Sequence, residues 1–257
     1  MVDRLPSFRS VILEEAGSTN SEAFARAFAG ESGPLWIMAR RQSHGRGRSG
    51  RPWASERGNL YASLLQKLVC RQNVVHQLSL LAGVATVEAI AAAAGAPIAG
   101  LRLKWPNDVL IGEAKCAGIL PESQMGAEGL EAVVVIGIGI NLASHPTGLG
   151  RAATHLGAHG VELEPEAMLG FLAEAVERWV EAWDGGAGFA RVRAAWLGYA
   201  GAVGESLSVD TGRERIAGTF LGLDDGGALL MRDVDGQRRR LTFGDVTLAR
   251  AAPQDRG

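Results

Sequence analysis

Residues 101–120 read LRLKWPNDVLIGEAKCAGIL, and this stretch decides the fold class of the chain. Pro-Asn-Asp between apolar runs is turn chemistry, so we expect strands at 101–105, 109–112 and 117–120 that neighbour one another in a meander. Helical patterns lie elsewhere in the chain. The sequence therefore predicts an α+β protein with a mixed or antiparallel sheet flanked by helices.

The same hairpin is expected to gather polar side chains. Because the strands of a hairpin are adjacent, Asn107, Asp108 and Lys115 can converge on one site. A lysine supplies a point charge for a phosphate or carboxylate oxygen, and an aspartate can accept a proton or orient a partner. The alternative is that Pro-Asn-Asp only forms a turn, but a turn does not need flanking lysines. Lysine is scarce here, at positions 67, 104 and 115 only, among 26 basic residues.

A second unusual stretch, called here the Gly/Arg stretch, is RRQSHGRGRSGRPW at residues 40–53. It has five arginines in residues 40–51 and no acid. Its glycines match G-x-G-x-x-G, but that fingerprint needs a helix at the last glycine, and here Arg-Pro-Trp and an alternating strand follow. Glycines between arginines instead indicate a loop that approaches an anion. Without the anion, we expect the guanidiniums to repel one another and the loop to be disordered. A solvated basic loop is the alternative.

Two further motifs allow structural and functional interpretations. Gly137-Ile138-Gly139-Ile140-Asn141 ends a continuous apolar run, where the glycines could serve tight strand packing or a ligand. Ser18-Thr19-Asn20 precedes a helical pattern, and Thr19-x-x-Glu22 fits a capping box. His155 and His159 are separated by a helix-breaking glycine and have no further Cys or His nearby, so we expect no zinc site.

The remaining pattern gives the domain organisation. After Gly201 the chain changes to five short runs separated by Gly and Asp-Gly turns, which is typical of a small closed barrel. We therefore expect a catalytic domain at 1–202 and a barrel domain at 203–257. Within the first domain we expect strands at 8–14, 35–41, 59–66 and 132–140, and helices through 28, over 76–94 and from Pro165 to a glycine break at 185–188.

Composition limits the classes of function. The chain has 257 residues, 47% hydrophobic, with a net charge of −2, which suits a soluble globular protein rather than a general nucleic-acid or membrane-surface binder. No apolar run approaches the roughly 20 residues that span a bilayer. The N-terminus lacks a signal-peptide core. Cys70 and Cys116 are expected to be reduced thiols in a cytoplasmic protein.

Taken together, the motifs resemble those of the biotin–protein ligase family. Ser18-Thr19-Asn20, the Gly/Arg stretch, Lys104-Trp105-Pro106-Asn107-Asp108, Lys115-x-Ala117-Gly118-Ile119-Leu120 and Gly137-x-Gly139-x-Asn141 follow the family's order and spacing. The resemblance covers almost the whole chain. It implies a class II synthetase-like catalytic domain and a C-terminal SH3-like β-barrel. No helix-turn-helix precedes the first strand, so the resemblance is to the monofunctional form without a DNA-binding domain.

The resemblance also implies roles for residues. The ureido ring of biotin would meet Ser18, Thr19 and Gln42, and Gly118 would line the biotin pocket. Gly45, Arg46 and Arg48 would close over the biotin carboxylate and the phosphates. The nucleotide would be bound by Arg48, Arg51, Trp53, Asn107, Lys115 and Asn141. Lys115, Arg48 and Asp108 would be catalytic, with Asp108 steering or deprotonating the acceptor lysine.

The implied reaction joins biotin to ATP as biotinoyl-5′-AMP and then transfers biotin to a lysine of a biotin carboxyl carrier domain of a carboxylase. Mg²⁺ would be held through the ATP phosphates rather than by a protein metal site. The family also allows a homodimer. One alternative is a lipoate or octanoate ligase of the same fold, which lacks the Gly-Arg-Gly-Arg loop. Another is a nucleic-acid-binding regulator that uses the arginines on phosphates.

Overall fold

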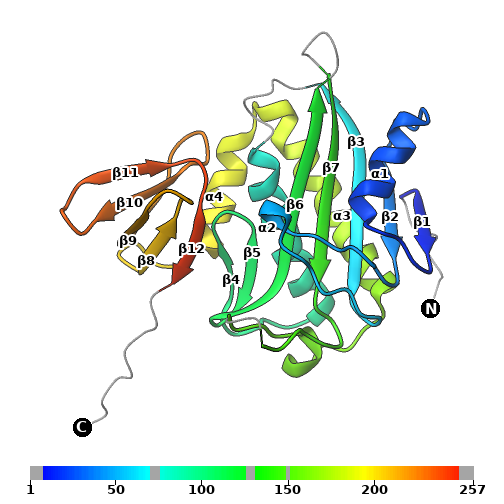
Figure 1. Ribbon diagram of the computed structural model, residues 1–257, viewed down its shortest axis with the longest axis horizontal. Coiled ribbons are helices and arrows are strands. Elements are labelled where there is room, and N and C mark those ends of the chain that lie inside the picture. The colour runs from blue at the N-terminus through cyan, green and yellow to red at the C-terminus, as the bar shows by residue number, and fades with distance from the viewer. Residues whose placement is uncertain (1–7, 70–75, 126–130, 149–150, 249–257) are drawn as a thin grey trace.

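The computed structural model describes residues 8–69, 76–125, 131–148 and 151–248 (Figure 1). Its larger sheet has seven strands in the order β1-β2-β3-β7-β6-β5-β4. The β1–β2 pair is parallel and the other pairs are antiparallel, so the sheet is mixed, as expected. The strands are β1 (Ser10–Leu13), β2 (Leu35–Ala39), β3 (Leu60–Val69), β4 (Leu101–Lys104), β5 (Asp108–Ile111), β6 (Ala114–Met125) and β7 (Glu131–Ile140).

Helices cover both faces of this sheet because its strands are apolar on both sides. On β2, Trp36 belongs to a buried cluster with α2 (Gln77–Ala94), α3 (Pro165–Trp183) and α4 (Phe189–Tyr199), whereas Ile37 packs with α1 (Thr19–Phe28) on the other face. Successive residues of a strand point to opposite faces. Gly137 and Gly139 therefore face the α1 side, like Val135, and this is the side on which the cleft lies.

Two of the helices confirm their sequence signals. Helix α2 ends at Gly95, which adopts the left-handed conformation at φ 64°, and α3 begins at Pro165. By length and composition α2 could cross a membrane, but 67% of its residues are buried inside the protein, as in a core helix. Helix α4 was not predicted, because the glycines at 185–188 indicated only a break.

The smaller sheet follows at the C-terminal end of the chain. It has the order β11-β10-β9-β8-β12, and all its pairs are antiparallel. Within residues 206–248 no ladder joins β11 to β12, so closure into a barrel stays a prediction, as does the domain boundary at 202/203. The strands are β8 (Ser206–Asp210), β9 (Arg215–Leu223), β10 (Leu229–Asp233), β11 (Arg238–Leu241) and β12 (Asp245–Leu248).

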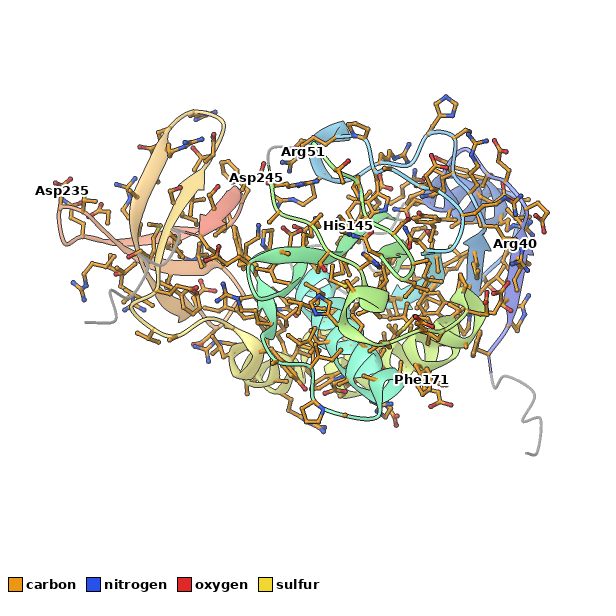
Figure 2. All side chains as sticks on the ribbon, turned by 90° about the horizontal axis from the view of Figure 1, so that it is seen from below. Arg40, Arg51, His145, Phe171, Asp235 and Asp245 are labelled. Atoms are coloured by element: carbon orange, nitrogen blue, oxygen red, sulfur yellow. The ribbon has the colours of Figure 1, made fainter. Side chains whose placement is uncertain are left out.

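The two sheets are joined through β4 and the turn that follows it. Arg102 forms an ion pair with Glu205 at 2.7 Å, and the indole Nε1 of Trp105 donates a hydrogen bond to the carbonyl of Gly227 at 3.2 Å. Buried side chains of both sheets belong to one apolar cluster. Figure 2 shows the smaller sheet extending from the end of the larger one where Asp245 lies. This junction positions β12 beside the cleft.

Candidate active site

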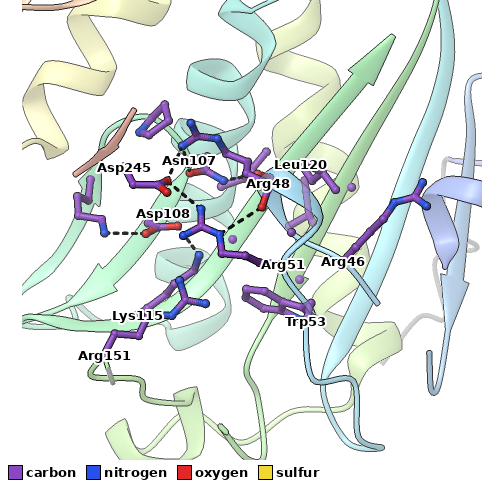
Figure 3. A pocket seen from close by; sticks show the side chains of 18 of the residues that line it. Arg46, Arg48, Arg51, Trp53, Asn107, Asp108, Lys115, Leu120, Arg151 and Asp245 are labelled. Carbon is purple, nitrogen blue, oxygen red and sulfur yellow. Dashed lines mark hydrogen bonds and ion pairs between the residues drawn. The ribbon is translucent and has the colours of Figure 1, made fainter. Parts of the chain in front are cut away.

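A cleft of about 510 Å³ lies on the α1 side of the large sheet (Figure 3). Its walls come from the start of α1, the Gly/Arg stretch, strands β5 to β7 and strand β12. Every residue that the sequence predicted for the site lines this cleft except Gly45 and Asn141. The segments that carry them lie far apart in the chain, and only the fold brings them together.

Two glycines on neighbouring strands form the floor of the cleft. Gly118 of β6 and Gly139 of β7 are register partners, and the indole of Trp53 lies against both. A Cβ atom on Gly118 would lie 2.9 Å from Trp53 Cζ3, and one on Gly139 would lie 2.8 Å from Trp53 Cε2. Both distances are shorter than real carbon contacts. Gly118 and Gly139 therefore leave room for the indole of Trp53, which comes from the Gly/Arg stretch. Because Gly139 also lines the cleft, its role towards a ligand stays a prediction.

A charged triad occupies the cationic end of the cleft. The carboxylate of Asp108, at the start of β5, pairs with Lys115 and lies 2.8 Å from the ammonium of Lys104. The side chains are only 10%, 12% and 21% exposed, for Asp108, Lys115 and Lys104 in turn. Burial raises the pKa of Asp108, but the two ammonium groups outweigh this and lower it to about 2.

Lys115 has a surplus of positive charge around it. Burial lowers the pKa of its ammonium; Asp108 opposes this shift and Arg151 reinforces it. The ammonium also lies 5.1 Å from the centroid of the Trp53 ring, a cation–π distance. An anion that enters beside Lys115 would offset this positive charge, so this end of the cleft suits anions. Asn107, Asp108 and Lys115 line the cleft together, as the hairpin argument predicted.

Acids from other elements pair with the arginines of the Gly/Arg stretch and offset the mutual repulsion expected from the sequence. The disorder expected of the free loop stays a prediction. Arg48 donates to Gly244 O at 3.1 Å and to Asn107 Oδ1 at 3.4 Å. Asp245 lies 3.5 Å from Arg48 and 2.8 Å from Arg51. Arg46 lies 3.5 Å from Glu122, and Arg40 and Arg41 pair with Glu14, Glu166 and Glu15. Most of these partners could not be identified from the local sequence.

The opposite end of the cleft is polar, small and buried. The backbone N–H of Thr19 donates to Gln42 Oε1 at 2.8 Å, and the Thr19 hydroxyl donates to the same atom at 3.2 Å. The hydroxyls of Thr19 and Ser63 are 2.7 Å apart. The helix begins at Thr19, its N-cap Ser18 makes no side-chain capping bond, and the capping-box interpretation of Thr19 is wrong. The hydroxyl is used towards the cleft instead.

Two predicted residues lie outside the cleft wall. Gly45 leaves no room for a side chain, because a Cβ would lie 2.5 Å from the carbonyl oxygen of Trp53. Asn141 is buried, and its amide donates to the carbonyl of Thr154 at 2.9 Å. Its nucleotide-binding role stays a prediction. Cys116 is buried with a free thiol, and Cys70 lies outside the described residues.

Sequence reasoning missed several groups that line the cleft. Lys104 was noted as part of its motif but was given no role. Asn20 sits against Gly137, where a Cβ would clash with its amide, and donates to Glu122 Oε2 at 2.6 Å. Arg151 and Asp245 carry no local signal, since each depends on a long-range packing contact. Their presence adds one cation near Lys115 and one acid shared by two arginines.

Known proteins are similar to this chain in sequence and in fold. A biotin–[acetyl-CoA-carboxylase] ligase of Paracoccus denitrificans is 40% identical to this chain over 233 residues, which span 88% of the chain and 95% of that relative. The chain belongs to the biotin–protein ligase family. The description of the matching family model is Biotin/lipoate A/B protein ligase family, and it covers residues 18–141 of the ligase. The cleft floor and the triad both fall within this range.

Solved structures agree with the fold of the ligase. The biotin protein ligase of Aquifex aeolicus in complex with biotin and ATP matches it with a TM-score of 0.77 at 27% identity, over 95% of this chain and 99% of that one. The biotin protein ligase of Leishmania major in complex with biotinyl-5-AMP matches with a TM-score of 0.63 at 25% identity, over 91% and 99%. The family resemblance and the fold class drawn from the sequence are confirmed.

Proposed function

We propose that the ligase activates biotin with ATP to biotinoyl-5′-AMP and transfers biotin to a lysine of a biotin carboxyl carrier domain. The observation that carries the proposal is the division of one cleft into a polar buried end and a cationic end, with a floor of glycine backbone between them. Relatives named as biotin ligases, and structures with biotin, ATP and biotinyl-5-AMP bound, support the choice of substrates.

In the first half-reaction an oxygen of the biotin carboxylate attacks the α-phosphorus of ATP, and pyrophosphate leaves. Two anions must approach each other, so cations must offset their repulsion. Lys115 would hold the carboxylate and the α-phosphate, while Arg48 and Arg51 would bind the other phosphates. Ser18, Thr19 and Gln42 would donate to and accept from the ureido group of biotin at the polar end.

In the second half-reaction the amine of the carrier lysine attacks the acyl carbon, AMP leaves with the electron pair of the broken anhydride bond, and the amine releases a proton to solvent. Asp108 is a weak base while two lysines hold its pKa near 2. We therefore assign it to orienting Lys115 rather than to deprotonating the acceptor. The mixed anhydride hydrolyses in water, so the Gly/Arg stretch that covers the cleft would also protect the intermediate.

Mg²⁺ belongs to this proposal as a partner of the ATP phosphates. The described residues contain no group of three or more His, Cys, Asp or Glu side chains placed to hold a metal ion. Oxygen ligands from the triphosphate suit Mg²⁺, which commonly keeps few protein ligands. When bound, the ion would offset phosphate charge. The carrier identity, a homodimer, the absence of a DNA-binding domain and a cytoplasmic location stay predictions.

The decisive experiment is ATP–pyrophosphate exchange measured with and without biotin. We expect exchange with biotin and none with lipoate or octanoate. Lys115→Ala should abolish exchange, whereas Lys67→Ala, on an exposed position of β3, should not change it. Exchange supported by lipoate alone would establish the rival ligase. Salt-sensitive DNA binding without any exchange would favour the nucleic-acid-binding regulator.

A further inference from the structure

An extended segment that starts at Arg151 lies alongside the strand that carries Lys115. The backbone N–H of Lys115 donates to the carbonyl of Ala152 at 3.0 Å, and the N–H of Thr154 donates to the carbonyl of Lys115 at 2.9 Å. A parallel bridge pairs Lys115 with Ala153. Backbone bonds on both sides of Lys115 therefore fix the segment relative to the lysine that the reaction uses.

Asn141 also holds this segment. Its side-chain amide donates to the carbonyl of Thr154 at 2.9 Å, and its own carbonyl accepts from the N–H of Leu156 at 3.0 Å. Asn141 is only 3% exposed and lies outside the cleft wall. The backbone N–H of Asn141 donates to Cys116 on β6, whereas the hydrogen bond of its side chain goes to this segment, so an effect of the Asn141 side chain on a ligand would pass through the segment.

The side chain at the start of the segment points into the cleft. Figure 3 shows Arg151 directed toward Lys115 and Trp53, and Arg151 lines the cleft. Within the described part of the chain, no carboxylate lies within 4.0 Å of its guanidinium, whereas Arg48 and Arg51 share Asp245. The acid nearest to Lys115 is Asp108, which already serves two lysines. Arg151 is exposed at the mouth of the cleft, and among the described residues no carboxylate pairs with its guanidinium, which is therefore available to an anion.

We infer that Arg151 is a further phosphate-binding residue of the ATP site and that Asn141 is a positioning residue that acts through Arg151. The inference rests on the proposed function. A triphosphate is favoured over the single carboxylate of biotin because it carries several negative charges, and a guanidinium can bind phosphate oxygens through two parallel hydrogen bonds. Lys115 would hold the reacting oxygens while Arg151 binds an oxygen of the same phosphate chain.

The test compares Arg151→Ala and Arg151→Lys with wild type and with Arg178→Ala, an exposed arginine of α3 far along the chain from the cleft residues. In biotin-dependent exchange we expect Arg151→Ala to raise the KM for ATP and for pyrophosphate by roughly ten- to a hundredfold, the loss of one charge-assisted contact. Arg151→Lys should recover part of this loss. The Kd for biotin, measured calorimetrically without nucleotide, should change by less than about twofold.

The positioning role has its own readout. Asn141→Ala should raise the KM for ATP in the wild-type background, but should add less than about threefold in the Arg151→Ala background, because both changes remove the same contact. Should Asn141→Ala fail to fold, Asn141→Asp replaces it, since the carboxylate keeps the size but cannot donate to Thr154. If Asn141→Ala raised the KM for ATP by the same factor in the Arg151→Ala background as in the wild type, Asn141 would not act through Arg151.

Other outcomes would overturn the phosphate assignment. A weakened Kd for biotin with an unchanged KM for ATP would place Arg151 on the biotin carboxylate. An unchanged KM for ATP together with an unchanged Kd for biotin would show that Arg151 binds neither ligand. Both results leave wild-type exchange intact, whereas a failure of the proposed function would abolish biotin-dependent exchange in the wild type itself.

Discussion

Replacing Asp108 with asparagine tests the charged triad most directly. The change removes the carboxylate that the ammonium groups of Lys104 and Lys115 share, in a place where the three side chains are at most 21% exposed. Two buried cations are then left facing a neutral amide. Breaking a buried ion pair by removing one partner costs about 3–5 kcal/mol. We therefore expect Asp108→Asn to lower the free energy of unfolding substantially.

The loss in free energy of unfolding can also be worked out from the pKa of Asp108. Its ordinary value of 3.8 falls to about 2 in the folded protein, and each unit is worth about 1.4 kcal/mol, so the native contacts of the ionised carboxylate contribute about 2 kcal/mol. An amide can still accept one hydrogen bond, which favours the lower end of the range. The expected loss on replacing Asp108 is about 2–3 kcal/mol, measured by urea denaturation at neutral pH.

The sign of the pH dependence follows from the same shift. A carboxylate with a lowered folded-state pKa contributes its stability above the unfolded value, so the contribution of Asp108 is complete above about pH 4 and is lost as the pH falls towards 2. The difference in stability between wild type and Asp108→Asn should shrink across this window. It should stay constant from about pH 5 to 8.

Lys104→Met supplies the control for the charge argument. Alone, it removes one cation and the hydrogen bond from Lys104 to Val246 O at 3.0 Å, and leaves Asp108 paired with Lys115. Combined with Asp108→Asn it should restore about 1 kcal/mol relative to the single Asp108 variant, because one buried charge is no longer opposed. A loss under about 1 kcal/mol for Asp108→Asn, or no recovery in the double variant, would refute the triad.

Three more results are expected. Biotin with MgATP should raise the melting temperature by several degrees and lipoate should not; a scan in which only lipoate raises it would contradict the substrate choice. Gly139→Ala should displace Trp53 and impair adenylate formation, whereas Gly170→Ala on α3, where a Cβ meets nothing within 4 Å, should leave exchange unchanged. Arg48→Gly should release biotinoyl-AMP roughly ten- to a hundredfold faster, read as labelling of serum albumin at equal ATP consumption; labelling no higher than wild type would show that the stretch does not retain the intermediate.

Much of the fold could be predicted because its signals are local. The apolar run at 132–140 is the central strand β7, Gly95 ends α2, and Pro165 begins α3. Helix α4 was missed although Phe189, Val192 and Trp196 are buried at helical spacing, because the preceding glycines dominated the interpretation. Local signals report where an element begins or ends, and they are weaker for an element that follows a break closely.

The site could be predicted only as a set of motifs. The hairpin argument correctly placed Asp108 beside Lys115, because strand pairing follows from the turn between them. The capping interpretation of Thr19 was wrong, and the acids that pair with the Gly/Arg stretch were not foreseen, since both depend on partners that come from distant segments. Arg151 and Asp245 acquire their places through packing across the fold, and no spacing rule connects them to the motifs.

The contact of β12 with the Gly/Arg stretch has a consequence for how the protein becomes active during its synthesis. Arg48 and Arg51 find their acid in Asp245, and Lys104 finds a carbonyl in Val246, so these partners are translated long after the segments that they contact. N-terminal segments generally fold first on the ribosome. A nascent chain could therefore build the large sheet while its cationic end still lacked these partners, and the finished electrostatics of the cleft would arrive only with β12.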